Sequence, residues 1–274
     1  MHIPDGMLDT KTFTTLWVGA GSGIGYASFW IRKHFDQKKI VLMAVLGALV
    51  FALQMLNFPI AGGTSGHFSG GALAGMLLGT WPAVIMMSAV LLIQAVFFGD
   101  GGITTLGANI VNMAIIAPLV GSVVFHLFNR RQSSPSRQII GATLGAWLAV
   151  VSAALAVSLQ LWAAGTAQFF AVLISMLFWH ALIGVAEAVV TVSIIIYITR
   201  TRPDILADTQ PIAQRSSAGP VMVLGVITGL AIGLSWLASS YPDGLEYVFN
   251  NNGGTLSGPA VGLFPGLLPG YLTP

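Results

Sequence analysis

The sequence predicts an all-α protein that crosses a membrane several times. Of its 274 residues, 55% are hydrophobic and only 7% are charged, whereas about a quarter of the residues in a soluble domain are charged. The mean hydropathy is +0.84, and apolar stretches long enough for membrane helices recur along the chain. Lipid offers no hydrogen-bond partners to an open backbone, so these stretches favour a polytopic bundle of membrane helices.

Eight membrane segments follow from the apolar stretches. The region 70–98 is divided at Trp81-Pro82, because proline disfavours a helical conformation in the residue before it. We therefore expect a seven-helix body and one C-terminal helix, with segments at 12–31, 40–57, 70–80, 82–97, 106–128, 139–163, 169–199 and 219–240.

The basic residues support this division. With 70–98 split, ten of the eleven fall on one side of the membrane, and only Lys11 falls on the other. Basic loops face the cytoplasm, so we expect the amino terminus to lie outside it, together with 58–69, 98–105 and 241–257. The ten cytoplasmic residues are Arg32, Lys33, Lys38, Lys39, Arg130, Arg131, Arg137, Arg200, Arg202 and Arg215.

Composition also divides the chain into three parts. Residues 1–200 contain the seven predicted helices of the body. Residues 201–218 are the most polar stretch and include Pro203 and Pro211, which indicates a cytoplasmic linker. Residues 219–274 then form a C-terminal accessory segment.

Several classes of function are disfavoured. The chain has no cysteine, which excludes disulfides and thiolate metal sites. The net charge is only +2 and the basic residues are split between short loops, so no nucleic-acid partner is expected. No Gly-x-x-x-x-Gly-Lys-[Ser/Thr] motif occurs. We therefore expect that the chain is not an enzyme, and that any ATP hydrolysis occurs in partner subunits.

The first two residues form a potential metal chelate. The Met1 amine, the His2 backbone nitrogen and the His2 imidazole Nδ1 can hold one ion through a five-membered and a six-membered ring. Tetragonal nitrogen coordination suits Ni(II) and Cu(II). We expect Met1 to be retained, because the bulky His2 should hinder its removal. The alternative is that His2 belongs to a disordered tail.

His67 can supply a fourth nitrogen. It lies in the glycine-rich stretch 62–71, which the predicted topology places on the same side as Met1. Irregular backbone near a membrane is tolerated where protein or a water-filled cavity surrounds it. The alternative is a flexible connector with a solvated histidine.

Other polar residues have supporting roles in this interpretation. His180 and Glu187 share a helix face about 10 Å apart along the axis, too far to bind one ion together. Glu187 is the only acid in a long apolar run, which suits either a functional or a hydrogen-bonding role. We expect hydrogen bonds from Asp100, Asn109 and Asn112 to order the loops. The less favoured option is that these residues form hydrogen bonds to metal ligands and orient them.

Two functions of other classes remain open. Gly63-Thr64-Ser65-Gly66 matches a Gly-x-Ser-Gly motif of intramembrane serine proteases, and Ser65 with His180 would then form a catalytic dyad. The chain can also be an accessory membrane subunit without a site of its own.

The chain resembles a known transporter family, and the motifs run over roughly residues 1–200. They are Met1–Gly6, Gly66–Phe68, Gln94–Asn109 and His180–Ala188. This pattern resembles the CbiM/NikM family, the substrate-binding membrane components of energy-coupling-factor transporters for cobalt and nickel. Pro242–Glu246 is similar to the PDGLE domain. That domain is expected to continue into another membrane helix, whereas 255–274 contains four prolines, so the appendage looks shortened.

The resemblance implies a site, a cargo and partners. The metal ligands would be the Met1 amine, the backbone and imidazole nitrogens of His2, and the His67 imidazole. Ni(II) or Co(II) would be the transported ion, with no separate cofactor, and a four-nitrogen plane favours nickel. The implied partners are a transmembrane coupling protein and two cytoplasmic ATPase subunits. The architecture also suggests a prokaryotic plasma membrane.

Overall fold

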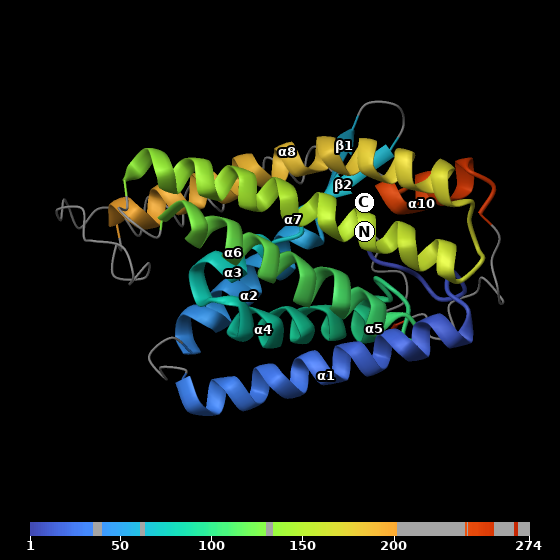
Figure 1. Cartoon of the computed structure of the whole chain (residues 1–274), viewed down its shortest axis with the longest axis horizontal. Helices are drawn as coiled ribbons and strands as arrows, with labels where there is room; N and C mark the ends of the chain where they lie inside the picture. The colour runs from blue at the N-terminus through green and yellow to red at the C-terminus, as the bar shows by residue number, and fades with distance from the viewer. Residues whose placement is uncertain are drawn as a thin grey trace.

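The computed structural model is a bundle of helices that lie side by side (Figure 1). It describes residues 1–34, 40–60, 64–129, 134–201, 239, 241–254 and 266–267. The α-helices are α1 (Thr10–His34), α2 (Ile40–Gln54), α3 (Gly71–Leu78), α4 (Thr80–Ile93), α5 (Leu106–Asn109), α6 (Ala117–Asn129), α7 (Pro135–Ala163), α8 (Phe169–Thr201) and α10 (Gly244–Asn251). The π-helical segment η2 (Gln94–Phe98) continues α4, and a second one, η3 (Ile110–Ile116), joins α5 to α6.

Four helical stretches of the described chain are long and apolar enough to cross a bilayer: Thr80–Phe98, Leu106–Asn129, Pro135–Ala163 and Phe169–Thr201. This confirms a multi-pass helical membrane protein. Helix α3 has only eight residues, or about 12 Å at 1.5 Å per residue, which is too short to span a bilayer. The count of seven helices plus one stays a prediction. All but one residue of the predicted helix 219–240, and all but one of the linker 201–218, lie outside the described residues.

The helix break between α3 and α4 lies two residues earlier than predicted. The chain turns at Gly79, whose φ of +84° suits glycine, rather than at Trp81-Pro82. Pro82 instead lies in the first turn of α4, where its missing N–H costs no intrahelical hydrogen bond.

A small antiparallel hairpin corrects the purely helical expectation. Strand β1 (Asn57–Ile60) pairs with β2 (Thr64–His67), and Asn57 lies opposite His67. Both strands are short and β2 contains glycine, so the sequence carries little strand signal. All four residues of β2 are buried. His67 is therefore part of an ordered strand and not of a flexible connector.

Helix α8 fixes the backbone that follows His67. The two carboxylate oxygens of Glu187 accept hydrogen bonds from the Ser69 N–H, at 2.6 Å, and the Gly70 N–H, at 2.9 Å. Gln54 of α2 donates to the Ser69 carbonyl from the other side. These bonds satisfy buried backbone groups that no helix or strand partner satisfies, and they hold β2 against the bundle.

Close helix packing depends on small residues. A Cβ atom at Gly75 would lie 2.2 Å from the Pro118 carbonyl oxygen, and one at Gly121 would lie 2.6 Å from the Ala72 Cα. Helices α3 and α6 therefore approach each other through glycine, as is common between membrane helices. This contact places α3 and the residues just before it in the centre of the bundle.

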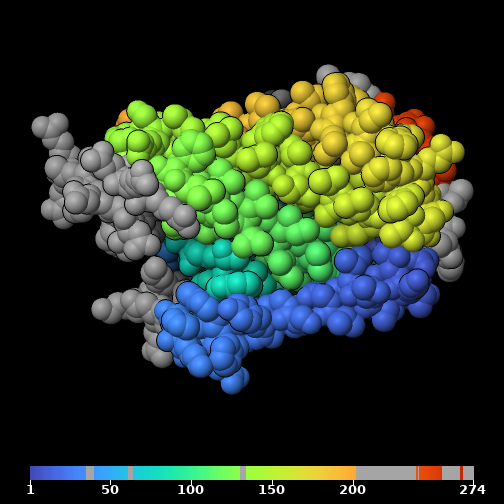
Figure 2. Space-filling model, viewed as in Figure 1, coloured from blue at the N-terminus to red at the C-terminus, as the bar shows by residue number. Residues whose placement is uncertain are grey.

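The surface and the two ends of the bundle differ in character. Helices α1 and α8 expose large apolar side chains, such as Phe29 and Phe178, along faces that suit lipid. Figure 2 shows α1 along one edge of the body. The ends of α1, α6 and α8 gather at one end of the molecule, whereas the hairpin and α10 lie toward the other end (Figure 1). Basic residues occupy the last turns of α1 and α8.

Replacing Glu187 by glutamine should loosen this arrangement. The amide group of Glu187→Gln retains one acceptor and turns a donor toward a backbone N–H, so the free energy of unfolding should fall by about 1–3 kcal/mol. Thermal unfolding in detergent measures the change. Ser193→Ala, which removes an exposed hydroxyl from the same helix, is the control. Equal stability of both variants and the unaltered protein would contradict this role of Glu187.

Candidate metal site

The amino-terminal segment is held in place by its own backbone. The Ile3 N–H donates to Asn109 Oδ1 at 2.8 Å, and Asn109 Nδ2 donates to the Ile3 carbonyl at 3.1 Å. The Ile3 carbonyl also accepts from the Thr105 hydroxyl and from the Gly102 N–H. These four hydrogen bonds fix the position of Ile3, and with it the point from which Met1 and His2 extend into the protein.

Asp5 fastens the same segment from its other end. Its carboxylate accepts hydrogen bonds from the Ile103 N–H, at 3.2 Å, and the Thr104 N–H, at 2.8 Å, and from the Thr104 hydroxyl. The side chains of Met1 and Ile3 are buried in a core that α7, α8 and α10 complete. The amino terminus is thus folded into the protein and is no disordered tail.

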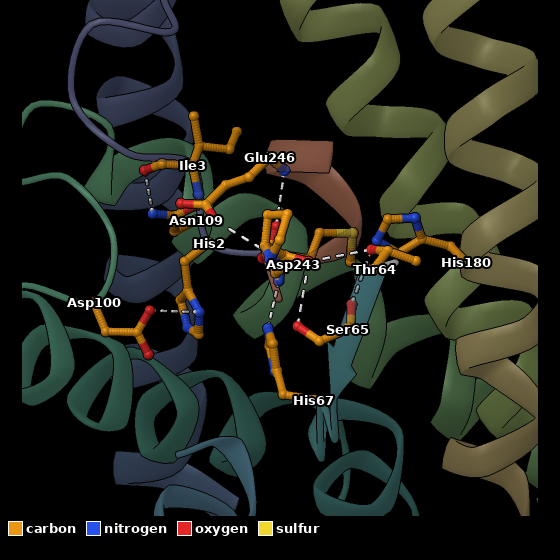
Figure 3. Close-up of polar contacts among 12 residues, drawn as sticks. His2, Ile3, Thr64, Ser65, His67, Asp100, Asn109, His180, Asp243 and Glu246 are labelled. Carbon is orange, nitrogen blue, oxygen red and sulfur yellow. Dashed lines mark hydrogen bonds and ion pairs between the residues drawn. The ribbon is translucent and has the colours of Figure 1, made fainter. Parts of the chain in front are cut away.

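The Met1 amine lies between the His67 imidazole and the Asp243 carboxylate, both of which are labelled in Figure 3. His67 Nδ1 is directed at the Phe68 carbonyl at 3.2 Å, so Nε2 faces the amine and contacts it. On the other side, Asp243 Oδ2 accepts from the amine at 2.8 Å. The structure therefore brings together Met1 and His67, which carry two of the predicted nitrogen ligands and lie 66 residues apart in the sequence.

The His2 ring lies next to that of His67. The two rings are stacked, with centroids 5.0 Å apart and planes inclined by 17°. His2 Nδ1 lies 3.2 Å from Asp100 Oδ1, so the imidazole nitrogen expected in the chelate has a carboxylate partner here. His2 Nε2 is buried without a hydrogen-bond partner among the described residues.

Burial sets the charge of these groups. The pKa values of His2 and His67 are each lowered to about 3, first by removal from water and then by the positive Met1 amine. Burial acts to raise the pKa of Asp243, but the Met1 amine and His67 outweigh it and hold that pKa below its usual value. Both imidazoles are therefore neutral at physiological pH, which is the form that binds a metal ion.

The remaining predicted residues divide into two groups. Asp100 and Asn109 contact the amino terminus directly. Asn112 instead exchanges two hydrogen bonds with Gln160 of α7, at 2.8 and 2.7 Å, and Glu187 holds the backbone after β2.

His180 lies behind the site. Its Nδ1 is directed at the Met176 carbonyl at 2.9 Å. The residue lines a cavity of about 10 Å³ together with Met1, His67 and Asp243, which has room for one water molecule.

The proposed serine dyad is not formed among the described residues. The Ser65 hydroxyl donates to the Tyr241 carbonyl at 2.8 Å, and no hydrogen bond joins it to His180. Ser65 is also fully buried.

Asp243 is the residue that sequence reasoning missed. The motif Pro242–Glu246 and its position in an outer loop were both visible in the sequence, but the pairing of Asp243 with Met1 spans 242 residues. Among the described residues, no group of three or more His, Cys, Asp or Glu side chains is arranged to hold a metal ion.

Residues 2–205 match the family model described as the cobalt uptake substrate-specific transmembrane region. A putative fused nickel transport protein of Archaeoglobus fulgidus is 34% identical over the whole chain and 89% of its own length. A putative metal transport protein of Haloquadratum walsbyi is 40% identical over 75% of this chain and 93% of its own. A solved structure of a truncated transition metal transporter is 34% identical, with a TM-score of 0.65 over 72% of this chain and 98% of its own.

The match to the family model covers most of the chain, and it includes the hairpin with His67, the loop with Asp100 and the helix with His180. Met1 and residues 206–274, which include Asp243, lie outside it. The chain belongs to the family of cobalt uptake substrate-specific transmembrane regions.

Proposed function

We propose that this chain captures Ni(II) or Co(II) outside the cytoplasm and serves as the substrate-binding subunit of an ATP-driven uptake system. The proposed ligands are the Met1 amine, the His2 backbone nitrogen, His2 Nδ1 and His67 Nε2. One observation carries the proposal: the terminal amine is buried and faces a neutral imidazole nitrogen. A terminal amine normally lies in solvent, so burial against a metal-ligating side chain calls for a function.

The donor set supports a transition metal. The four nitrogens include two neutral imidazoles, and imidazole suits nickel, copper and zinc, whereas carboxylates and carbonyls suit magnesium and calcium. The carboxylates of Asp100 and Asp243 lie beside these nitrogens and can orient ligands and balance the charge of a bound cation. Names of relatives and of the family mention nickel and cobalt. We favour nickel, because the four nitrogens suit tetragonal coordination.

The distribution of charge supports the proposed orientation. Arg32 and Lys33 end α1, and Arg200 ends α8, at the end of the bundle away from the hairpin. Basic residues prefer the cytoplasmic side, which leaves the amino terminus outside. The proposed partners are a transmembrane coupling protein and two cytoplasmic ATPase subunits, because the sequence has no P-loop of its own.

Removal of the His67 imidazole should abolish tight binding. In His67→Ala one of the four nitrogens is lost, so nickel affinity should fall by more than the 10–100-fold that changes to outer partners of metal ligands usually cost. Titration of the purified full chain with nickel measures the loss. His34→Ala removes an exposed imidazole at the far end of α1 and should bind nickel like the unaltered protein. Equal affinity of the two variants would exclude the site.

Extension of the amino terminus should have the same effect without changing any side chain. A Gly-Ser dipeptide before Met1 converts the amine into an amide and requires space in a buried position. We expect no tight nickel binding by the extended protein. Insertion of the same dipeptide after Pro274 is the control. Tight binding by the amino-terminally extended protein would contradict the proposed ligand set.

Nickel affinity should rise between about pH 6 and about pH 8, because the terminal amine and the His2 amide must release protons to the solvent when the metal binds. The imidazoles, whose pKa values are about 3, are already neutral over this range and should add little. Competition with a chelator of known pH dependence measures the slope. An affinity independent of pH would show that neither terminal nitrogen binds the metal.

A further inference from the structure

The C-terminal segment, defined here as residues 241–254, is docked directly onto the strand that ends in His67. The Ser65 N–H donates to the Pro242 carbonyl at 2.9 Å, and the Ser65 hydroxyl donates to the Tyr241 carbonyl at 2.8 Å. Asp243 forms a parallel bridge to Ser65. The segment therefore extends the hairpin by one short stretch of paired backbone, and this pairing fixes its register beside the proposed site.

Helix α10 anchors the segment by apolar packing. Leu245, Val248 and Phe249 are buried in the same core as Met1 and Ile3. Burial of these side chains away from water is stabilising, so the C-terminal segment and the amino terminus hold each other in place. The same contacts leave the first turn of α10 next to the terminal amine.

Asp243 joins these two elements through its two oxygens. Oδ1 accepts from the Glu246 N–H at 2.9 Å and caps α10, while Oδ2 accepts from the Met1 amine at 2.8 Å. Glu246 completes a capping box with the Asp243 N–H. The carboxylate cannot turn away from Met1 without leaving its place at the start of the helix.

The pairing also satisfies a charge requirement. The amine is buried, and a buried positive charge without a partner is costly. A nickel ion held by the four nitrogens carries two positive charges, of which the deprotonated His2 amide cancels one. One positive charge remains at the site with or without the ion, so the Asp243 carboxylate, which lies directly against the amine, has a positive partner in both states, with Asp100 beside His2.

We propose that Asp243 is a positioning residue of the metal site, which orients the Met1 amine toward His67. The C-terminal segment contributes to the site by supplying this residue. The inference rests on the proposed nickel site. The family model ends before Asp243, so the segment adds a second carboxylate to the one that Asp100 contributes from the matched part of the chain.

The test replaces Asp243 by asparagine in the full chain. Asparagine is as good a helix cap as aspartate, so Asp243→Asn removes the charge and leaves α10 capped. We expect nickel affinity to fall about tenfold and release of nickel to a chelator to become faster. The visible absorption spectrum of bound nickel should not change, because Asp243 is not a ligand. The control is Asp9→Asn, since Asp9 accepts from the Thr12 N–H at the start of α1 away from the site.

A second variant tests the docking of the segment without touching the carboxylate. Ser65→Ala removes the hydroxyl that donates to Tyr241 and Pro242, so nickel release should become about threefold faster. An affinity and release rate of Asp243→Asn within twofold of those of Asp9→Asn would overturn the inference. An altered nickel spectrum in Asp243→Asn would overturn it as well, because Asp243 would then bind the metal. Failure of the proposed function is separate: His67→Ala would then bind nickel as tightly as the unaltered protein.

Discussion

Burial of the terminal amine is the constraint on which the rest of this structure depends. An ammonium group can leave water only with a partner, and here it has Asp243 on one side and the His67 imidazole on the other. Each partner needs support of its own. His67 is held by the hairpin and by Glu187, Asp243 by the capping box of α10, and Met1 by the hydrogen bonds of Ile3 and Asp5.

Close packing between helices makes this arrangement of the amino terminus and His67 possible. Glycine contacts between α3 and α6 bring the start of α3 into the centre of the bundle, and the strand that precedes α3 carries His67 there. Helix α8 then supplies Glu187, whose carboxylate accepts hydrogen bonds from two backbone N–H groups just after His67. The proposed site combines main-chain nitrogen with neutral imidazole in a buried position, and among the described residues no three or more His, Cys, Asp or Glu side chains are grouped to hold a metal ion.

Sequence reasoning was strongest where the physics is local. Composition and apolar length predicted a multi-pass helical membrane protein, and the covalent connectivity of Met1-His2 alone predicts a chelate. It missed two short local features and one contact between distant segments. The break before α4 depends on a glycine with positive φ and not on Pro82, and the hairpin is too short to have a periodic pattern. Asp243 meets Met1 across 242 residues, a contact that no single-sequence pattern encodes.

The C-terminal segment is packed onto the rest of the chain. The matched family region ends at 205, yet α10 packs into the same core as the amino terminus. The described part of the C-terminal segment is thus integrated with the body. Because the segment packs in this way, the Asp243 carboxylate can accept a hydrogen bond from the terminal amine and cap α10 at the same time.

The most direct test of the ligand set is X-ray absorption at the nickel edge on the metal-loaded full chain. The account predicts four nitrogen donors, two of them with the scattering pattern of imidazole, and no sulfur from Met1. A first shell dominated by oxygen, or one that contains the thioether of Met1, would contradict the central claim that the terminal amine binds the metal.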